Sequence, residues 1–188
     1  MPRSGVSSRG TKRTQAESPA APAPAPPARR PVVLLVEDDV RVCDLVVRLL
    51  ERAGLTVRTA VDAPAALACL AEGVDLVLLD VLLPRGDGFE LCRLVRTYEG
   101  DDYLPIIMLT ALGDEGHRHA GFLAGADDYI TKPFSNLDLL DRVQVWLRAR
   151  ERMAALKDRL LREQEQRLQS ARERRSARAP RRRSPLAS

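Results

Sequence analysis

The sequence predicts a doubly wound α/β domain, in which a parallel sheet is covered by helices on both faces. Three observations lead to this prediction. Short apolar runs alternate regularly with segments whose apolar residues recur at helical spacing. The first run, residues 32–36, is continuously apolar, as expected of a strand buried on both faces. The alternation continues without a break through one long stretch of the chain, which indicates a single domain.

Each predicted element follows from its composition and its ends. The first helix carries apolar residues at 42, 45, 46, 49, 50 and 53, and Gly54 is expected to end it. The second helix, 63–71, accommodates Pro64 in its first turn. The other predicted elements are strands at 55–60, 74–79, 104–109 and 128–131, and helices at 89–97, 114–124 and from 137 onward. Five strands that each precede a helix predict a five-stranded parallel sheet of flavodoxin-like order 2-1-3-4-5, with an extended C-terminal helix.

Composition divides the chain of 188 residues into one ordinary domain and flanking segments. We expect a disordered arm rich in Pro, Ala and Arg at 1–30 and the globular domain at 31–148. A helical extension should follow at 149–170, and a disordered Arg-rich tail at 171–188. A second full domain is not expected, because about forty residues after the first are too few for one.

The net charge of +4 conceals a strong asymmetry along the chain. It is +5 in residues 1–30, −10 in 31–147 and +9 in 148–188. Basic arms favour polyanions such as nucleic acid or anionic lipid, although solvated charge runs in disordered tails are commoner. The tail from 171 onward has no aromatic residue on which bases could stack, so nucleic-acid contact there would be non-specific and sensitive to salt.

Cysteine usage and apolar content bear on where the protein works. Cys43, Cys69 and Cys92 are odd in number and lie among apolar neighbours, which indicates reduced core thiols and a cytoplasmic protein. No apolar stretch approaches the roughly 20 residues that a membrane span needs. The basic N-terminus also lacks the apolar block of a secretory signal.

Acidic residues follow two of the predicted strands. Glu37, Asp38 and Asp39 come directly after the first strand, and Asp80 ends the third. We expect these side chains to face one another, because the carboxyl ends of neighbouring parallel strands meet at one edge. The alternative is that they are solvated or cap the next helix, as Asp39 would. Clustered carboxylates need a cation, and oxygen ligands suit Mg²⁺.

The fourth and fifth strands bring a hydroxyl and an ammonium group to the same edge, from Thr110 and Lys132. A lysine at a strand end is by itself usually solvated. Four strand ends that all carry suitable groups, however, indicate a site able to hold a metal ion beside a phosphoryl group.

Four segments of the chain closely resemble the response-regulator receiver family of two-component signalling. They are VLLVEDD at 33–39, LVLLDVLLPRGDG at 76–88, PIIMLTA at 105–111 and GADDYITKPF at 125–134. The resemblance covers about residues 31–148 and is greatest to the receivers of winged-helix transcription regulators, although no winged-helix domain follows here.

The resemblance implies roles for individual residues. Asp80 would be the phosphoacceptor for a sensor histidine kinase or a histidine phosphotransfer protein. Asp38, Asp80 and the backbone carbonyl of Leu82 would bind Mg²⁺ directly, with Glu37 reaching it through water. Lys132 would pair with a phosphoryl oxygen, or with Asp80 before phosphorylation, and the peptide bond after Lys132 would be cis. Such a protein is a phosphoacceptor with slow self-dephosphorylation rather than an enzyme.

The resemblance also implies a conformational switch. The Thr110 hydroxyl would move toward the phosphoryl group and let Tyr129 turn inward, which would change the face formed by helix 114–124, strand 128–131 and the final helix. The alternative is that Tyr129 is an ordinary strand residue. Charged residues expected on this face match those that related receivers use to dimerise, namely Arg118, Asp127, Asp128, Asp138 and Arg142.

The output of the protein is left open by the sequence. Met153, Leu156 and Leu160 have heptad-like spacing, but Glu163 and Arg167 would continue the same seam. A short parallel coiled coil and a single solvated helix therefore remain alternatives. Three functions stay open: a stand-alone receiver that controls a protein partner, a transcription regulator that contacts DNA through its basic tail, and an interaction scaffold built on the C-terminal helix.

Overall fold

The computed structural model describes residues 29–84, 86–98, 103–111 and 121–177. Its strands are β1 (Val32–Val36), β2 (Thr56–Ala60), β3 (Leu76–Asp80), β4 (Leu82–Leu83), β5 (Gly86–Asp87), β6 (Ile106–Ala111) and β7 (Asp128–Lys132). Its helices are α1 (Val40–Arg52), α2 (Ala63–Ala71), α3 (Gly88–Tyr98) and α5 (Asn136–Ala177). Residues 121–124 are also helical, whereas the rest of the helix predicted at 114–124 lies outside the described residues.

The main sheet has the predicted architecture. Its five strands are parallel and lie in the order β2-β1-β3-β6-β7, which is the expected 2-1-3-4-5 arrangement. Val36 pairs with Leu79, so the ends of β1 and β3 are adjacent. The antiparallel pair β4-β5 was not predicted. Two-residue strands are too short for hydrophobic periodicity to reveal.

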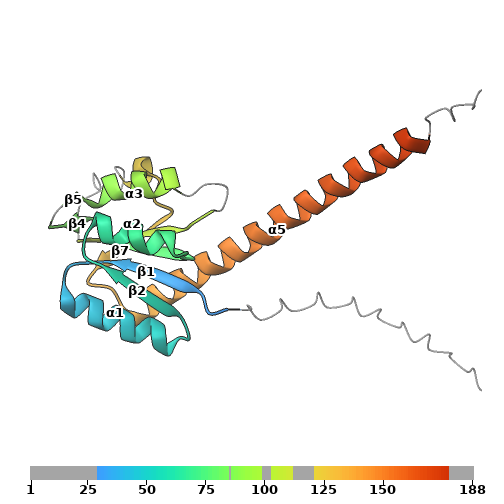
Figure 1. The fold of residues 1–188 in the computed structure, drawn as a ribbon. Coiled ribbons are helices and arrows are strands. Elements are labelled where there is room, and N and C mark those ends of the chain that lie inside the picture. The colour runs from blue at the N-terminus through green and yellow to red at the C-terminus, as the bar shows by residue number, and fades with distance from the viewer. Residues whose placement is uncertain (1–28, 85, 99–102, 112–120, 178–188) are drawn as a thin grey trace, which may run out of the picture.

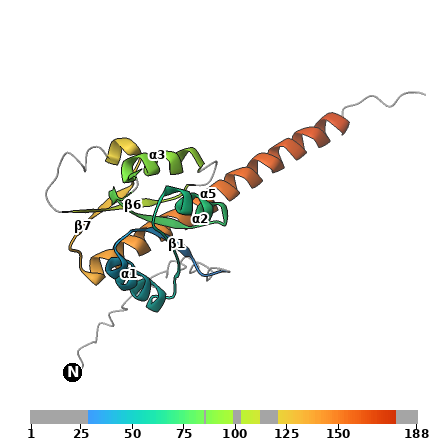
Figure 2. The ribbon, with the colours of Figure 1, turned by 60° about the vertical axis from the view of Figure 1, so that its left-hand side comes forward.

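Helices cover both faces of this sheet (Figure 1). α1 and the first part of α5 lie on one face, while α2 and α3 lie on the other, as the second view also shows (Figure 2). The buried strands β1 and β3, apolar except for Asp80 at the end of β3, supply both cores, because alternate side chains point to opposite faces. Val46, Leu50 and Leu139 pack on the α1 and α5 side. Burial on both sides explains why these strands read as continuous apolar runs.

Short-range signals position the helix ends, and those at Asp39 and Gly54 were predicted. The Asp39 carboxylate accepts a hydrogen bond of 2.8 Å from the Arg41 backbone N–H at the start of α1. At its end, Gly54 takes the left-handed conformation with φ +85°, and its N–H donates to the Glu51 carbonyl. The Asp62 carboxylate caps α2 in the same way as Asp39 caps α1.

Helix α5 is longer than predicted. It continues past residue 170 to Ala177, and its second half projects far from the domain (Figure 1). The physical reason is that no Gly or Pro interrupts the chain before Pro180, so nothing in the sequence ends the helix at 170. The predicted arm 1–30, apart from residues 29 and 30, and the tail from 178 lie outside the described residues. In the part of the chain that is described, no helix combines the length and apolar character of a membrane span.

A buried carboxylate fixes both extensions to the domain at the amino edge of the sheet. Asp75, directly before β3, is 5% exposed. It accepts hydrogen bonds from the Arg29 guanidinium at 2.7 and 2.8 Å and from the Val32 N–H at 2.8 Å. It also bonds the guanidinium of Arg150, three residues beyond Leu147, which is the last buried apolar residue of α5. The N-terminal segment and the projecting helix therefore share one anchor.

Asp75→Asn should lower the free energy of unfolding by about 2 kcal/mol, because two guanidinium groups lose their charged partner at a buried position. Urea denaturation measures this loss. Hydrogen exchange should also become faster in residues 147–155. The matched control is Asp44→Asn, which removes an ion pair with Arg48 in which both side chains are more than half exposed, and which should change stability by less than about 0.5 kcal/mol. Equal effects of the two substitutions would contradict the anchor role.

Candidate functional site

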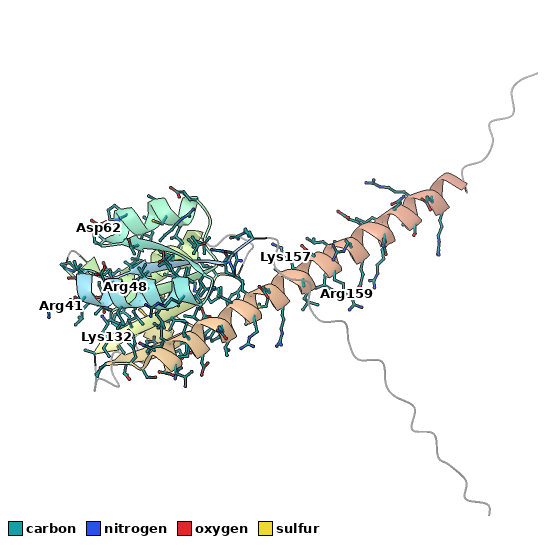
Figure 3. The ribbon with its side chains drawn as sticks, turned by 90° about the horizontal axis from the view of Figure 1, so that it is seen from below. Arg41, Arg48, Asp62, Lys132, Lys157 and Arg159 are labelled. Atoms are coloured by element: carbon teal, nitrogen blue, oxygen red, sulfur yellow. The ribbon has the colours of Figure 1, made fainter. Side chains whose placement is uncertain are left out.

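The carboxyl edge of the sheet holds an ion triad. The Lys132 ammonium, at the end of β7, lies 2.7 Å from an Asp80 carboxylate oxygen and 2.6 Å from a Glu37 carboxylate oxygen. Both acids are buried, at 6% and 1% exposure. Lys132 lies at the end of the domain opposite to Lys157 and Arg159 on the projecting helix (Figure 3). The structure thus brings together three of the residues that the sequence predicted for one site.

The geometry of this triad follows from the sheet. Val36 and Leu79 are paired neighbours, so Glu37 and Asp80 each follow directly at the same edge. The peptide bond between Lys132 and Pro133 is cis, as expected. The lysine side chain spans the ends of the strands between β7 and β1 and reaches Glu37. The parallel sheet therefore brings Glu37 and Lys132, which are 95 positions apart in the sequence, close enough to form an ion pair.

Burial and charge shift the protonation equilibria in the triad. Burial raises the pKa of Glu37, and the neighbouring charge of Asp80 adds to this, although the hydrogen bond from Lys132 acts in the opposite direction. Burial alone would lower the pKa of Lys132. Its hydrogen bonds with Asp80 and Glu37 outweigh burial and hold the pKa above its usual value. Lys132 is therefore cationic at neutral pH.

The acidic residues are close enough to bind a metal ion together. One carboxylate oxygen from each of Glu37, Asp38 and Asp80 can be chosen so that all three lie within 4.8 Å of one another. Asp38 is exposed, which leaves the group open to solvent on one side. Asp38 and Leu82 also line a surface groove beside β4 and β5. Hard carboxylate oxygens in this number suit Mg²⁺, which keeps several of its waters.

The first residue of α3, Gly88, packs closely against the backbone of Asp80, and the sequence did not predict this contact. A Cβ atom added to Gly88 would lie 2.3 Å from the Asp80 carbonyl oxygen and 2.8 Å from the Val81 Cα. The Gly88 N–H donates to the Val81 carbonyl at 3.0 Å. The Asp87 carboxylate caps the helix by accepting from the Phe89 N–H at 2.9 Å. The glycine in the segment 76–88 was visible in the sequence, but its contact with β3 was not.

Thr110 and Tyr129, the predicted switch pair, lie on the same side of the sheet. Thr110 is 4% exposed, and its hydroxyl donates to the Ala111 carbonyl at 3.3 Å. Tyr129 is 6% exposed and pairs in register with Met108, two residues before Thr110, so alternation places all three side chains on one face. The tyrosine side chain is thus buried on the same face as the Thr110 hydroxyl.

The predicted charged face is assembled only in part. The Arg142 guanidinium donates to Asp128 at 2.7 and 2.9 Å and to Asp138 at 2.9 Å. These hydrogen bonds raise the pKa of Arg142, and the bond with Asp138 has the largest effect. Asp127 is held elsewhere, 2.5 Å from the Arg96 guanidinium and 2.7 Å from the Tyr103 hydroxyl. It also accepts from the Ile106 N–H. Arg118 lies outside the described residues.

Comparisons with known proteins agree with this arrangement. The sequence profile of the response regulator receiver domain family matches residues 33–144, more than half of the chain. The DNA-binding dual master transcriptional regulator RpaA of Synechocystis is 42% identical over 124 residues, which are 65% of this chain and 52% of RpaA. The transcriptional regulatory protein GltR of Pseudomonas aeruginosa is 45% identical over 117 residues, 62% of this chain and 48% of GltR.

Solved structures show the same fold. The crystal structure of a putative response regulator from Chloroflexus aurantiacus superimposes with a TM-score of 0.60 at 41% identity. The match covers 63% of this chain and 98% of that one. By contrast, the chain spans about half the length of the curated relatives it matches. The likeness therefore covers the domain with the ion triad and not the whole of those regulators.

Gly88→Ala should destabilise the protein by about 1–3 kcal/mol, since a methyl group there overlaps the backbone of β3. Urea denaturation measures the effect. Gly86→Ala is the matched control, because nothing lies within 4 Å of a Cβ at that position, and it should change stability by less than about 0.5 kcal/mol. If both substitutions are neutral, α3 does not depend on a close approach to Asp80.

Proposed function

This chain belongs to the response regulator receiver domain family, and from that premise we propose that Asp80 accepts a phosphoryl group from a phosphohistidine on a histidine kinase or a histidine phosphotransfer protein. The observation that carries the proposal is the triad: a buried carboxylate at a strand end lies 2.7 Å from a lysine ammonium. Lys132 is also placed to neutralise the negative charge that an incoming phosphoryl group brings to this carboxylate nucleophile.

The transfer needs few groups. An Asp80 carboxylate oxygen forms a bond to phosphorus, the bond from phosphorus to the histidine nitrogen breaks, and that nitrogen keeps the electron pair. Lys132 then stabilises a phosphoryl oxygen, which replaces Asp80 as its partner. Asp38, Asp80 and the Leu82 carbonyl would hold Mg²⁺, with Glu37 acting through water; when bound, the ion neutralises phosphoryl charge. Slow hydrolysis of the acyl phosphate follows from the same arrangement.

The signal would leave through Thr110 and Tyr129. A phosphoryl group on Asp80 offers oxygen acceptors at the edge where Thr110 ends its strand, and movement of its hydroxyl changes the space beside Tyr129. The affected surface is then the one formed by residues 121–124, β7 and α5. Arg142, which already donates to Asp128 and Asp138 there, would take part with them in any pairing of receivers on this face.

A specific feature favours α5 as the output element. Beyond Leu147 the helix exposes large apolar side chains, each about half accessible, and they fall within one arc of the helix: Met153, Leu156, Leu160, Leu161 and Leu168. Exposed apolar side chains in a regular row indicate an interaction surface. The spacing of Met153, Leu156 and Leu160 suits a second copy of the same helix in a short coiled coil, which would make the protein a homodimer. Of the basic tail 171–188 expected as a DNA contact, residues 171–177 belong to α5, and those from 178 onward lie outside the described residues.

Incubation with acetyl phosphate and Mg²⁺ should add one phosphoryl group at Asp80, detectable by intact mass and lost at alkaline pH. Removal of the ion with a chelator should slow the reaction at least about a hundredfold, because the positioned charge is lost. Asp80→Asn should abolish the adduct, whereas Asp87→Asn, at an exposed acid nearby, should retain it. An adduct of unchanged yield in Asp80→Asn would overturn the proposal.

Leu156→Glu combined with Leu160→Glu should convert a dimer into a monomer, since two charges would be buried in the seam. Light scattering coupled to size exclusion gives the mass, with and without acetyl phosphate. Ala155→Glu, on the opposite and polar side of the same helix, is the matched control and should leave the mass unchanged. A wild-type protein that stays monomeric at all concentrations and in both states would exclude the coiled coil.

A further inference from the structure

Gly121 lies directly against the Tyr129 side chain. A Cβ atom added to Gly121 would lie 1.7 Å from the Tyr129 hydroxyl oxygen, 2.6 Å from Cζ and 2.8 Å from Cε1. Real Cβ contacts are essentially never shorter than 3.0 Å, so the ring cannot occupy its present position if residue 121 carries any side chain. The end of the ring and the glycine backbone therefore share one space.

Other residues pack near the Tyr129 ring or belong to the same buried cluster. The Phe122 ring stands edge-on to the Tyr129 ring, with centroids 4.8 Å apart and an angle of 67° between the planes. Ala124, Ala126 and Met108 belong to the same buried cluster as Tyr129. Tyr129 is 6% exposed, and the end of its ring occupies space that a side chain at position 121 would fill.

Helix propensity gives no reason for this glycine. Residues 121–124 are helical, and a glycine inside a helix costs about 1 kcal/mol relative to alanine. Neither is a positive φ involved, since the glycines with positive φ among the described residues are Gly54, Gly73 and Gly125. The contact with Tyr129 is the feature of the structure that accounts for glycine here.

We propose that Gly121 is a positioning residue for the phosphorylation switch: by leaving room for the ring, it sets the balance between the buried and the outward position of Tyr129. The inference rests on the proposed function, because it assumes that the tyrosine responds to a phosphoryl group on Asp80. It adds a residue on a different segment of the chain, which acts through Tyr129 and touches neither Asp80 nor Lys132. A side chain at 121 would hold the ring outward in both phosphorylation states.

A double-mutant cycle tests the steric part of the proposal without phosphorylation. In the wild-type background, Gly121→Ala should lower the urea midpoint. In a Tyr129→Ala background the overlap is gone, and the same substitution should instead raise the folding equilibrium constant about fivefold through helix propensity. If Gly121→Ala alone fails to fold, the double variant should fold. Equal effects of Gly121→Ala in the two backgrounds, or a double variant that stays unfolded, would overturn the proposal.

Fluorine spectroscopy tests the switch. The chain contains three tyrosines, and 3-fluorotyrosine labelling gives each a resonance, with that of Tyr129 assigned by Tyr129→Phe. In wild type this resonance should already be largely shielded from solvent, since Tyr129 is 6% exposed, and acetyl phosphate with Mg²⁺ should shield any remaining outward population. The Gly121→Ala variant should form the Asp80 adduct in normal yield, while its Tyr129 resonance stays exposed to solvent. A normal adduct with a normal shift would refute the role of Gly121.

Failure of the phosphoacceptor function and failure of the role proposed for Gly121 would give different results. An absent adduct in the wild-type protein would refute the phosphoacceptor function, while the cycle would still report on the steric contact. Gly86→Ala serves as the control in both experiments, because a Cβ there meets nothing within 4 Å. It should change neither the urea midpoint nor the Tyr129 resonance.

Discussion

Glu37 and Asp80, two acids that are almost completely buried, share the ammonium group of Lys132, and the rest of the site depends on this charge balance. Two carboxylates side by side in a buried position repel each other, and a cation is required to hold them there. The lysine provides it from the edge strand β7, so the triad depends on the register of the four neighbouring strands β1, β3, β6 and β7. Folding and the assembly of the site are therefore one event, and a phosphoryl group would compete for a cation that the fold already requires.

A second constraint links the two ends of the domain. Helix α5 begins four residues after Lys132 at the carboxyl edge, crosses one face of the sheet, and meets Asp75 at the amino edge through Arg150. The same helix carries the partners of Asp128 and, farther on, an exposed apolar row. A change at the acidic edge thus acts on an element that reaches the opposite end of the domain and continues beyond it. Under the proposed function, this one helix would connect the phosphoacceptor edge with the exposed apolar row.

Most of the fold could be predicted because it depends on local patterns. Continuous apolar runs marked the buried strands, and Asp39 and Gly54 marked the ends of α1 with their own side chain or backbone conformation. The predictions failed where a local pattern was missing or where the cause is not local. The β4-β5 pair is too short for any periodicity, and the length of α5 beyond residue 170 depends on the absence of a stop signal. Asp75 looked like one polar residue within an apolar strand, since its partners are 46 and 75 positions away.

The sequence by itself determined the order of elements, the acids, hydroxyl and lysine that end the strands, and the family to which they belong, because strand ends and motifs are written in neighbouring residues. Only the tertiary structure decided which of these groups meet. It joined Lys132 to Glu37 as well as to Asp80, turned Asp127 toward Arg96 and away from Arg142, and set Gly88 and Gly121 against the backbone of β3 and the ring of Tyr129. Such contacts depend on packing between segments that are distant in sequence. A shift of about 1 Å is enough to break a hydrogen bond or a close contact, and no local sequence pattern specifies distances that finely.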